Sequence, residues 1–231
     1  MFTVPFCNEY ADIAFVVDVS GSIEGDGENP GYFDRYVKSF LKDFARKLNV
    51  GSEKIQIGLV TFGNEGRLEF PLKNTTDEVI AGIDNIRYNP FGENTNTSGG
   101  INIMRAEVLG EQSPNYRQQA AHVAIVLTDG KSTYDRNQTI ISANEAKKQG
   151  IIMFAIGVTF GVDMNELLGI SSEITTYNST GIEDSQRKGV FVSNGLVSYV
   201  PNIAELDGIV SRLMAIMSNT TCVNGKCNFH P

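Results

Sequence analysis

Oxygen-bearing side chains follow two apolar runs of this sequence. The run Ile13–Val17 is followed by Asp18-Val19-Ser20-Gly21-Ser22, the run 122–128 is followed by Asp129-Gly130, and a polar loop at 94–100 contains Thr95. The set offers two carboxylates and several hydroxyls, with no His or Cys nearby in the sequence. Hard oxygen ligands of this kind suit Mg²⁺, Mn²⁺ or Ca²⁺ and disfavour Zn²⁺ or copper. The chemistry predicted for these residues is the binding of a divalent cation.

The elements that must position these residues are buried strands, because short apolar runs alternate with longer amphipathic segments from residue 11 onward. Such alternation is typical of a mostly parallel sheet covered by helices. In an open parallel sheet, ligands bind in the crevice beyond the carboxyl ends of the strands. The three loops can therefore meet at one point, and both carboxylates are expected at solvent-facing strand ends. The predicted fold class is α/β, a Rossmann-like, doubly wound, six-stranded sheet with helices on both faces.

Six strands and six helices are predicted. The strands are expected at 13–17, 55–62, 67–72, 122–128, 151–157 and near 189–193, and the helices at 33–48, 76–86, 98–109, 138–148, 163–170 and 202–218. The second and third strands must form an antiparallel hairpin, because only the turn Gly-Asn-Glu-Gly separates them. The third strand is thus predicted to be an antiparallel edge. Residues 171–200, rich in Ser, Thr, Asn and Gly, are expected to form a long surface excursion.

The three parts of the candidate site together resemble the metal-ion-dependent adhesion site of von Willebrand factor A domains. Those parts are Asp-x-Ser-x-Ser after an apolar strand, a distal Thr loop, and Thr-Asp-Gly after another apolar strand, and the likeness covers roughly residues 10–218 in element order. The first motif alone is a weak signal, whereas all three at strand ends are a strong one. The resemblance implies that Ser20 and Ser22 coordinate the metal directly, Thr95 directly or through water, and Asp18 and Asp129 mostly through water. Thr95 rather than Thr97 matches the first Thr of the family's loop.

The resemblance also implies a function. Metal ligands that are mainly neutral hydroxyls leave the charge of the ion poorly neutralised and one coordination position open for a partner's carboxylate. The family uses this arrangement to bind matrix proteins, including collagens, and cell-surface proteins. The sequence is therefore interpreted as an extracellular adhesion or matrix-binding domain with Mg²⁺ as its cofactor. The alternative is a structural matrix module that binds collagen or itself independently of the metal.

Other classes of function find less support in the sequence. A metal-dependent hydrolase or phosphotransfer enzyme would need a nucleophile or base and a phosphate-binding loop. The chain has no P-loop, Gly-x-Gly-x-x-Gly or Gly-x-Ser-x-Gly motif, and neither of its two histidines, His122 and His230, is near a candidate nucleophile. The net charge of -8 and the absence of a long basic run argue against nucleic acid as a partner. No apolar stretch is long enough for membrane insertion, and residues 1–10 lack a signal-peptide pattern.

The loop that follows Ser22 departs from the family pattern. Residues 23–31 look longer than the family norm and add Glu24, Asp26 and Glu28 beside the predicted metal. These acids could repel acidic ligands or hold a second cation such as Ca²⁺, but a solvated acidic loop is the favoured interpretation.

Three cysteines lie near the ends of the chain. Cys7 precedes the first apolar run, and Cys222 and Cys227 follow the last predicted helix. A bond from Cys7 to Cys222 is predicted, with Cys227 as the second choice, and on the chain-entropy model so long a loop contributes about 5 kcal/mol. The alternatives are a local Cys222–Cys227 loop that leaves Cys7 free, and three unpaired thiols in a cytosolic protein.

Sequons add to the extracellular interpretation. N-glycosylation is predicted at Asn74, Asn137, Asn178 and Asn219, whereas Asn96 lies inside the metal loop and is expected to be bare. The expected organisation is an N-terminal lead at 1–10, one domain at 11–218 and a tail at 219–231, in a secreted protein of the extracellular matrix.

Overall fold

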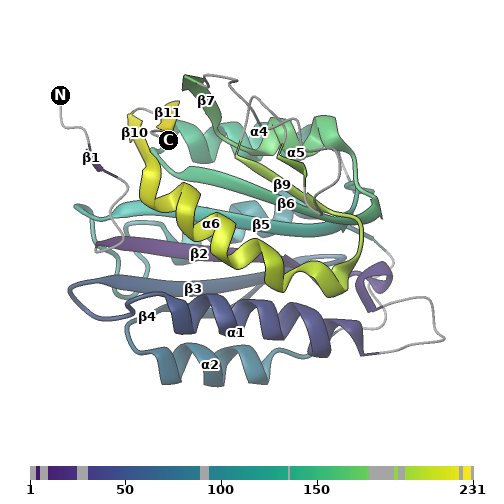
Figure 1. Ribbon diagram of the computed structural model, residues 1–231, viewed down its shortest axis with the longest axis horizontal. Helices are drawn as coiled ribbons and strands as arrows, with labels where there is room; N and C mark the ends of the chain where they lie inside the picture. Colours follow the sequence, from purple (N-terminus) through teal and green to yellow (C-terminus); the bar gives the residue numbers. More distant parts are fainter. Residues whose placement is uncertain are drawn as a thin grey trace.

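Seven strands form one sheet in the order β4-β3-β2-β5-β6-β9-β8 (Figure 1). Their bounds are Gly66–Lys73 for β4, Ile55–Phe62 for β3, Ala11–Asp18 for β2, Ala121–Gly130 for β5, Ile152–Gly161 for β6, Val197–Val200 for β9 and Val190–Phe191 for β8. The computed structural model describes residues 4–5, 10–24, 31–88, 94–134, 136–176, 190–191, 196–223 and 226–229. The predicted α/β fold with a mostly parallel sheet is confirmed.

Strand β2 lies at the centre of the sheet, between β3 and β5 and parallel to both. All eight of its residues are buried. Its side chains alternate between the two faces, so that Phe15 and Val17 join one apolar cluster while Ala14 and Val16 join the other. Burial on both faces is the reason why the strand reads as a continuous apolar run.

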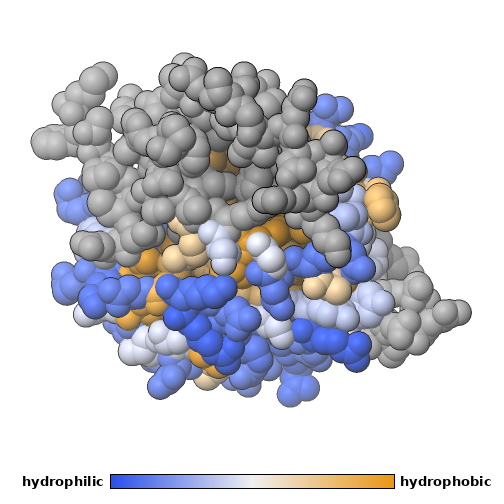
Figure 2. All heavy atoms as spheres, in the orientation of Figure 1, coloured by the Kyte–Doolittle hydropathy of each residue, from blue (hydrophilic) through white to orange (hydrophobic). Residues whose placement is uncertain are grey.

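Helices cover both faces of the sheet. One face packs against α1 (Lys38–Lys47), α2 (Thr76–Asn85) and α6 (Asp207–Asn219), and the other against α3 (Thr97–Ile103), α4 (Arg136–Lys148) and α5 (Met164–Ile170). Short helical turns lie at Gly21–Glu24, Phe33–Val37, Met104–Val108 and Ile203–Glu205. Hydrophilic residues cover the face over α1 and α2, and apolar residues are visible in a band above them (Figure 2). No helix in the described part of the chain is long and apolar enough to cross a membrane.

The two edges of the sheet are both antiparallel. The predicted hairpin is confirmed, because β4 pairs antiparallel with β3 at one edge. At the other edge the expected strand near 189–193 corresponds to the short β8, which pairs antiparallel with β9. Between β6 and β8 lies β9, which pairs parallel with β6 and was not among the predicted strands. Part of the expected surface excursion at 171–200 is therefore core, with Val197 and Val200 almost fully buried.

A second, four-stranded sheet joins the two ends of the chain. Its order is β1 (Val4–Pro5), β10 (Thr220–Val223), β11 (Lys226–Phe229) and β7 (Glu173–Thr176). It lies away from the carboxyl ends of the central strands (Figure 1). The predicted domain limits at 10 and 218 fall next to Ala11, where β2 begins, and Asn219, where α6 ends, and they stay predictions.

Two of the three cysteines lie in this second sheet. Cys222 is directly opposite Cys227 in the β10–β11 hairpin, and Val4 of β1 is opposite Cys222. Antiparallel neighbours keep their Cα atoms about 4.5–5.5 Å apart, which is within the range that a disulfide spans. The pairing of β10 with β11 therefore also permits a Cys222–Cys227 bond in place of the predicted Cys7–Cys222 bond. Cys7 lies outside the described residues, so the bond stays a prediction.

Disulfide mapping decides between these pairings. We expect a non-reduced digest analysed by mass spectrometry to contain a peptide from the Cys7 region joined to the peptide with Cys222, because β1 pairs with β10 and Val4 lies opposite Cys222. The same digest after reduction is the control. A digest in which Cys222 is joined only to Cys227 would contradict the prediction.

Candidate metal-binding site

Asp18 ends β2 and is fully buried. Its Oδ1 accepts a hydrogen bond from the backbone N–H of Ser20 at 2.8 Å, and its Oδ2 accepts one from the hydroxyl of Thr128 at 2.7 Å. The first bond shapes the turn after the strand, since Asp side chains commonly accept from the backbone two residues on. The second bond ties the end of β2 to β5. Asp18 therefore fixes the loop of Ser20 relative to the neighbouring strand.

Asp129 lies near the end of β5 and is 3% exposed. Its Oδ1 accepts a hydrogen bond from the Ser22 hydroxyl at 2.9 Å, and the hydroxyl oxygens of Ser20 and Ser22 are 3.3 Å apart. The structure thus brings both predicted serines to the second carboxylate. The expectation that the carboxylates face solvent is wrong, because the loops that follow the strands fold over Asp18 and Asp129.

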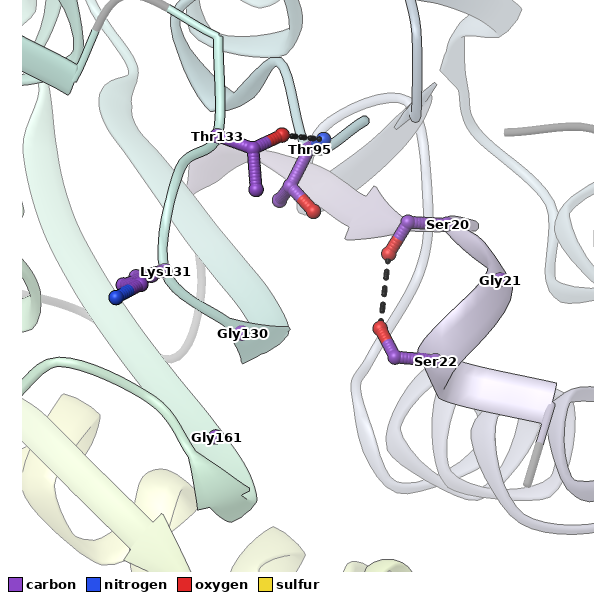
Figure 3. A pocket seen from close by; sticks show the side chains of 8 residues that line it. All are labelled: Ser20, Gly21, Ser22, Thr95, Gly130, Lys131, Thr133 and Gly161. Atoms are coloured by element: carbon purple, nitrogen blue, oxygen red, sulfur yellow. Dashed lines mark hydrogen bonds between the residues drawn. The ribbon is translucent and has the colours of Figure 1, made fainter. Parts of the chain in front are cut away.

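Thr95 reaches the same place from the loop before α3. Its backbone N–H donates to the Thr133 hydroxyl at 2.8 Å, and the Thr133 N–H donates to the Thr95 carbonyl at 3.1 Å. Its hydroxyl points toward those of Ser20 and Ser22 (Figure 3). Thr97 is fully buried, and its hydroxyl oxygen lies 2.7 Å from that of Ser132, away from this cluster. These positions support the choice of Thr95 over Thr97.

A pocket of about 300 Å³ opens over these side chains (Figure 3). It is lined by Ser20, Gly21, Ser22, Thr95, Gly130, Lys131, Thr133 and Gly161. The predicted ligands therefore surround one solvent-accessible space, with Asp18 and Asp129 directly behind the lining serines. Whether a metal is bound by all five residues stays a proposal.

The two carboxylates carry an electrostatic problem. Burial raises the pKa of the Asp18 carboxyl, and burial together with the negative charge of Asp18 raises the pKa of Asp129 to about 7. Among the described residues, no ion pair neutralises either group. A dication would offset the two negative charges, and the facing hydroxyls are neutral ligands for it. The residues present therefore fit a divalent cation.

The donor set also restricts which cation fits. Within the described ranges there is no group of three or more His, Cys, Asp or Glu side chains that could hold a metal. The oxygen donors at this pocket are the hydroxyls of Ser20, Ser22 and Thr95 with the carboxylates of Asp18 and Asp129 behind them, and oxygen donors suit hard cations.

The acidic loop after Ser22 is used in part by the fold. The carboxylate of Glu24 accepts hydrogen bonds from the N–H groups of Gly31 at 2.7 Å and Phe33 at 3.2 Å. It thus satisfies unpaired donors at the start of the helix that leads into α1. Asp26 and Glu28 lie outside the described residues, and a second cation here stays an open proposal.

Residues that no sequence motif marks hold the loops around the pocket. Thr133 clamps the backbone of Thr95, and Ser132 beside it donates from its N–H and hydroxyl to the buried carboxylate of Glu166, at 3.0 and 2.6 Å. Thr139 shares this network at 2.9 Å from the Ser132 hydroxyl. The only signals in the sequence are the hydroxyl groups shortly after Thr-Asp-Gly and the polar side chains on the buried faces of α4 and α5.

The predicted glycosylation sites are only partly described. Asn137 is exposed on α4 and Asn74 is half-buried before α2, whereas Asn178 and the side chain of Asn219 lie outside the described part. The side chain of Asn96 caps α3 by accepting from the Gly99 N–H at 2.9 Å, and it donates to the carbonyl of Asn64 at 3.2 Å. These contacts support the expectation that Asn96 is bare, and glycosylation stays a prediction.

A mostly parallel α/β sheet with an oxygen-lined pocket at its carboxyl edge defines the class of this domain, and comparison with known proteins gives its family. Residues 12–188 match the von Willebrand factor type A domain. The collagen alpha-5(VI) chain of Mus musculus is 32% identical over 71% of this chain. The chain belongs to the von Willebrand factor A domain family.

Other relatives agree with this assignment. The collagen alpha-1(XX) chain of Mus musculus is 34% identical over 73% of this chain. This chain spans 6% and 12% of the two collagen chains. The solved structure of proximal thread matrix protein 1 from the mussel byssus, with a zinc-occupied metal-ion-dependent adhesion motif, is 26% identical with a TM-score of 0.72, covering 92% of this chain and 46% of that chain. With such relatives the chain is an extracellular-matrix domain, as predicted.

The raised pKa of Asp129 predicts how the metal-free domain responds to pH. The unfolded carboxyl titrates near 3.8 and the folded one at about 7. Between these values the folded state binds more protons, so the free energy of unfolding falls as the pH rises through this window. In chelator, we expect the melting temperature to fall from about pH 4.5 to about pH 7. Mg²⁺ should restore stability at the upper end, because it replaces the missing positive charge.

The variant Asp129→Asn should show a smaller fall than the unmodified protein, because the side chain that titrates and the repulsion on Asp18 are both removed. Glu145→Gln, at a half-buried position on α4 whose carboxylate pairs with Lys148, is the control and should keep the full fall. A melting temperature in chelator that rises over the same pH range would contradict this prediction.

Proposed function

We propose that this domain binds a divalent cation and uses it to capture a carboxylate of an extracellular-matrix protein such as a collagen. Asp18, Ser20, Ser22, Thr95 and Asp129 would hold the cation. Mg²⁺ is the proposed ion, with Mn²⁺ or Ca²⁺ as alternatives, because the donors are hard oxygens. The single observation that carries the proposal is the pair of buried carboxylates behind a solvent-open hydroxyl cluster, with no cationic partner among the described residues.

The residues of the chain would share the work as follows. Ser20, Ser22 and Thr95 present neutral oxygens to the pocket, and Asp18 and Asp129 supply negative charge from behind them. When bound, a divalent cation supplies an incompletely neutralised positive charge with an open coordination position. A partner's Glu or Asp side chain can approach through the open pocket. The zinc-occupied site of the mussel matrix protein supports the placement of a cation in this fold.

Binding rather than catalysis is proposed because the pocket lining offers no base. The Ser22 hydroxyl donates to the carboxylate of Asp129, and that carboxylate would serve the cation. His122 begins β5 at the opposite end of the strands. Its Nε2 lies 3.1 Å from the Arg117 carbonyl, and burial lowers the pKa of His122. His122 is thus a mostly buried residue near the start of β5 and is not part of the pocket lining.

Calorimetry tests the metal site directly. Asp129→Asn is expected to lower the Mg²⁺ affinity by about 10- to 100-fold, the range for groups that act on a metal through an intervening water or ligand. Thr95→Ala should have a milder effect, because its hydroxyl is one of several neutral donors. Glu145→Gln should leave the affinity unchanged. Unchanged Mg²⁺ affinity in Asp129→Asn and in Asp18→Asn, with circular dichroism showing folded proteins, would place the site elsewhere.

The adhesion proposal is tested by binding to immobilised collagens and other matrix proteins in Mg²⁺, in Mn²⁺ and in EDTA. We expect binding in either cation, loss in EDTA, and loss in Asp129→Asn at any Mg²⁺ concentration that leaves its site empty. Circular dichroism in EDTA confirms that the fold persists. Binding that survives both EDTA and Asp129→Asn would instead support a structural module that binds collagen or itself independently of the metal.

A further inference from the structure

Exposed aromatic residues flank the pocket. The described part of the chain has three exposed large hydrophobic side chains, Tyr134 at 57%, Ile141 at 52% and Phe160 at 85%. Phe160 is next to Gly161, and Tyr134 is next to Thr133, and both of these neighbours line the pocket. Adjacent Cα atoms are only about 3.8 Å apart. Two of the three exposed apolar side chains thus belong to residues that directly adjoin the pocket lining in the chain.

Phe160 is held outward by an irregular end of β6. Thr128 pairs with Gly157 and Gly130 pairs with Gly161, so that three residues of β6 face the single residue Asp129. Bulges of this kind re-aim side chains and are frequent next to functional sites. Here the bulge turns Phe160 into solvent, at a place where regular pairing would continue the sheet.

The bulge is strained and fixed to the metal loop. Thr159 has φ 64°, which is costly for a β-branched residue and is found where the surroundings impose it. Its hydroxyl donates to the Asp129 carbonyl at 3.2 Å. A Cβ on Gly161 would lie 2.7 Å from the same oxygen, so only glycine fits there. The fold therefore maintains an exposed phenyl ring through contacts to a residue of the site itself.

The pocket lining also includes a positively charged side chain, that of Lys131. Lys131 lines it beside Gly130, is exposed, and forms no ion pair among the residues described. Its side chain lies across the pocket from Ser20 and Ser22 and points away from them (Figure 3). An unpaired cation near the rim complements an acidic ligand and disfavours a basic one.

We infer that Phe160, with Tyr134, forms an apolar rim that selects partner segments in which an apolar side chain lies close to the metal-bound carboxylate. This inference rests on the proposed function and adds a specificity to it. The occupant is an extended segment of a matrix protein that carries an acidic residue and, roughly two to four residues away at about 3.3 Å per residue, an aliphatic one. Exposed aromatic rings that become buried at an interface are typical affinity anchors.

The test uses the full chain in Mg²⁺ and synthetic peptides with one Glu in a Gly/Ser background. One set carries a Leu at two, three or four positions before or after the Glu, and the matched set has Ser there. For at least one spacing we expect the Leu peptide to bind about ten-fold more tightly than its Ser counterpart. Replacing Glu by Gln should abolish binding in both sets.

Variants assign the preference to the rim. Phe160→Ser should remove the difference between Leu and Ser peptides, Phe160→Leu should keep most of it, and Ile141→Ser, the matched exposed position on α4, should leave it unchanged. Tyr134→Ser should reduce it. The Mg²⁺ affinity of Phe160→Ser should stay unchanged, because Phe160 lies outside the proposed ligand set.

The outcomes separate this inference from the function on which it rests. Binding that needs Glu and Mg²⁺ but is indifferent to Leu and to Phe160→Ser would overturn the rim and leave the adhesion site standing. A lower Mg²⁺ affinity in Phe160→Ser would indicate that the ring stabilises the position of Asp129, and it would also overturn the inference that the ring selects ligands. If no peptide or matrix protein binds in a Mg²⁺-dependent way, the proposed function fails and the rim with it.

Discussion

The repulsion between Asp18 and Asp129 is the constraint around which this end of the fold is built. The carboxylates come from neighbouring parallel strands, and in the described structure they are surrounded by donors from Ser20, Ser22 and Thr128 rather than by a cationic side chain. These bonds stabilise the ionised groups only in part, because burial still raises the pKa of both. Ionising both buried carboxylates costs free energy when no cation is present. Such a site is well suited to bind a cation, because the positive charge offsets this cost.

The loops around the pocket are held by a buried network behind it. The carboxylate of Glu166 on α5 accepts a hydrogen bond from Ser132. Thr133, the residue after Ser132, accepts from the backbone of Thr95, and the side chain of Asn96 caps α3. A buried carboxylate is costly unless it is hydrogen-bonded or paired, and Glu166 has both kinds of contact, including one to Arg136. The loops of Thr95 and Asp129 therefore behave as one supported unit, although they are distant in the sequence.

The sequence predicted the central strands and the oxygen-bearing residues that gather at the pocket, because both leave local patterns. Continuous apolar runs mark β2 and β5, and each ends at its Asp. The last parallel strand, Val197–Val200, left no such pattern, since it is four residues long and its pairing with β6 is decided by distant contacts. Thr133 and Glu166 were missed for a similar reason, because their roles depend on partners that only the folded chain brings near. A Thr at positive φ gives no signal at all.

Asp129 is the residue at which these features meet. Its carboxylate faces the Ser22 hydroxyl in the pocket, while its carbonyl accepts from Thr159 and abuts Gly161 in the bulge that displays Phe160. A change in the position of this residue would therefore act on both the proposed cation ligands and the proposed apolar rim. This connection explains why the strained backbone at Thr159 is kept. A relaxed end of β6 would separate the Phe160 ring from Asp129, the residue that sets the geometry of the site.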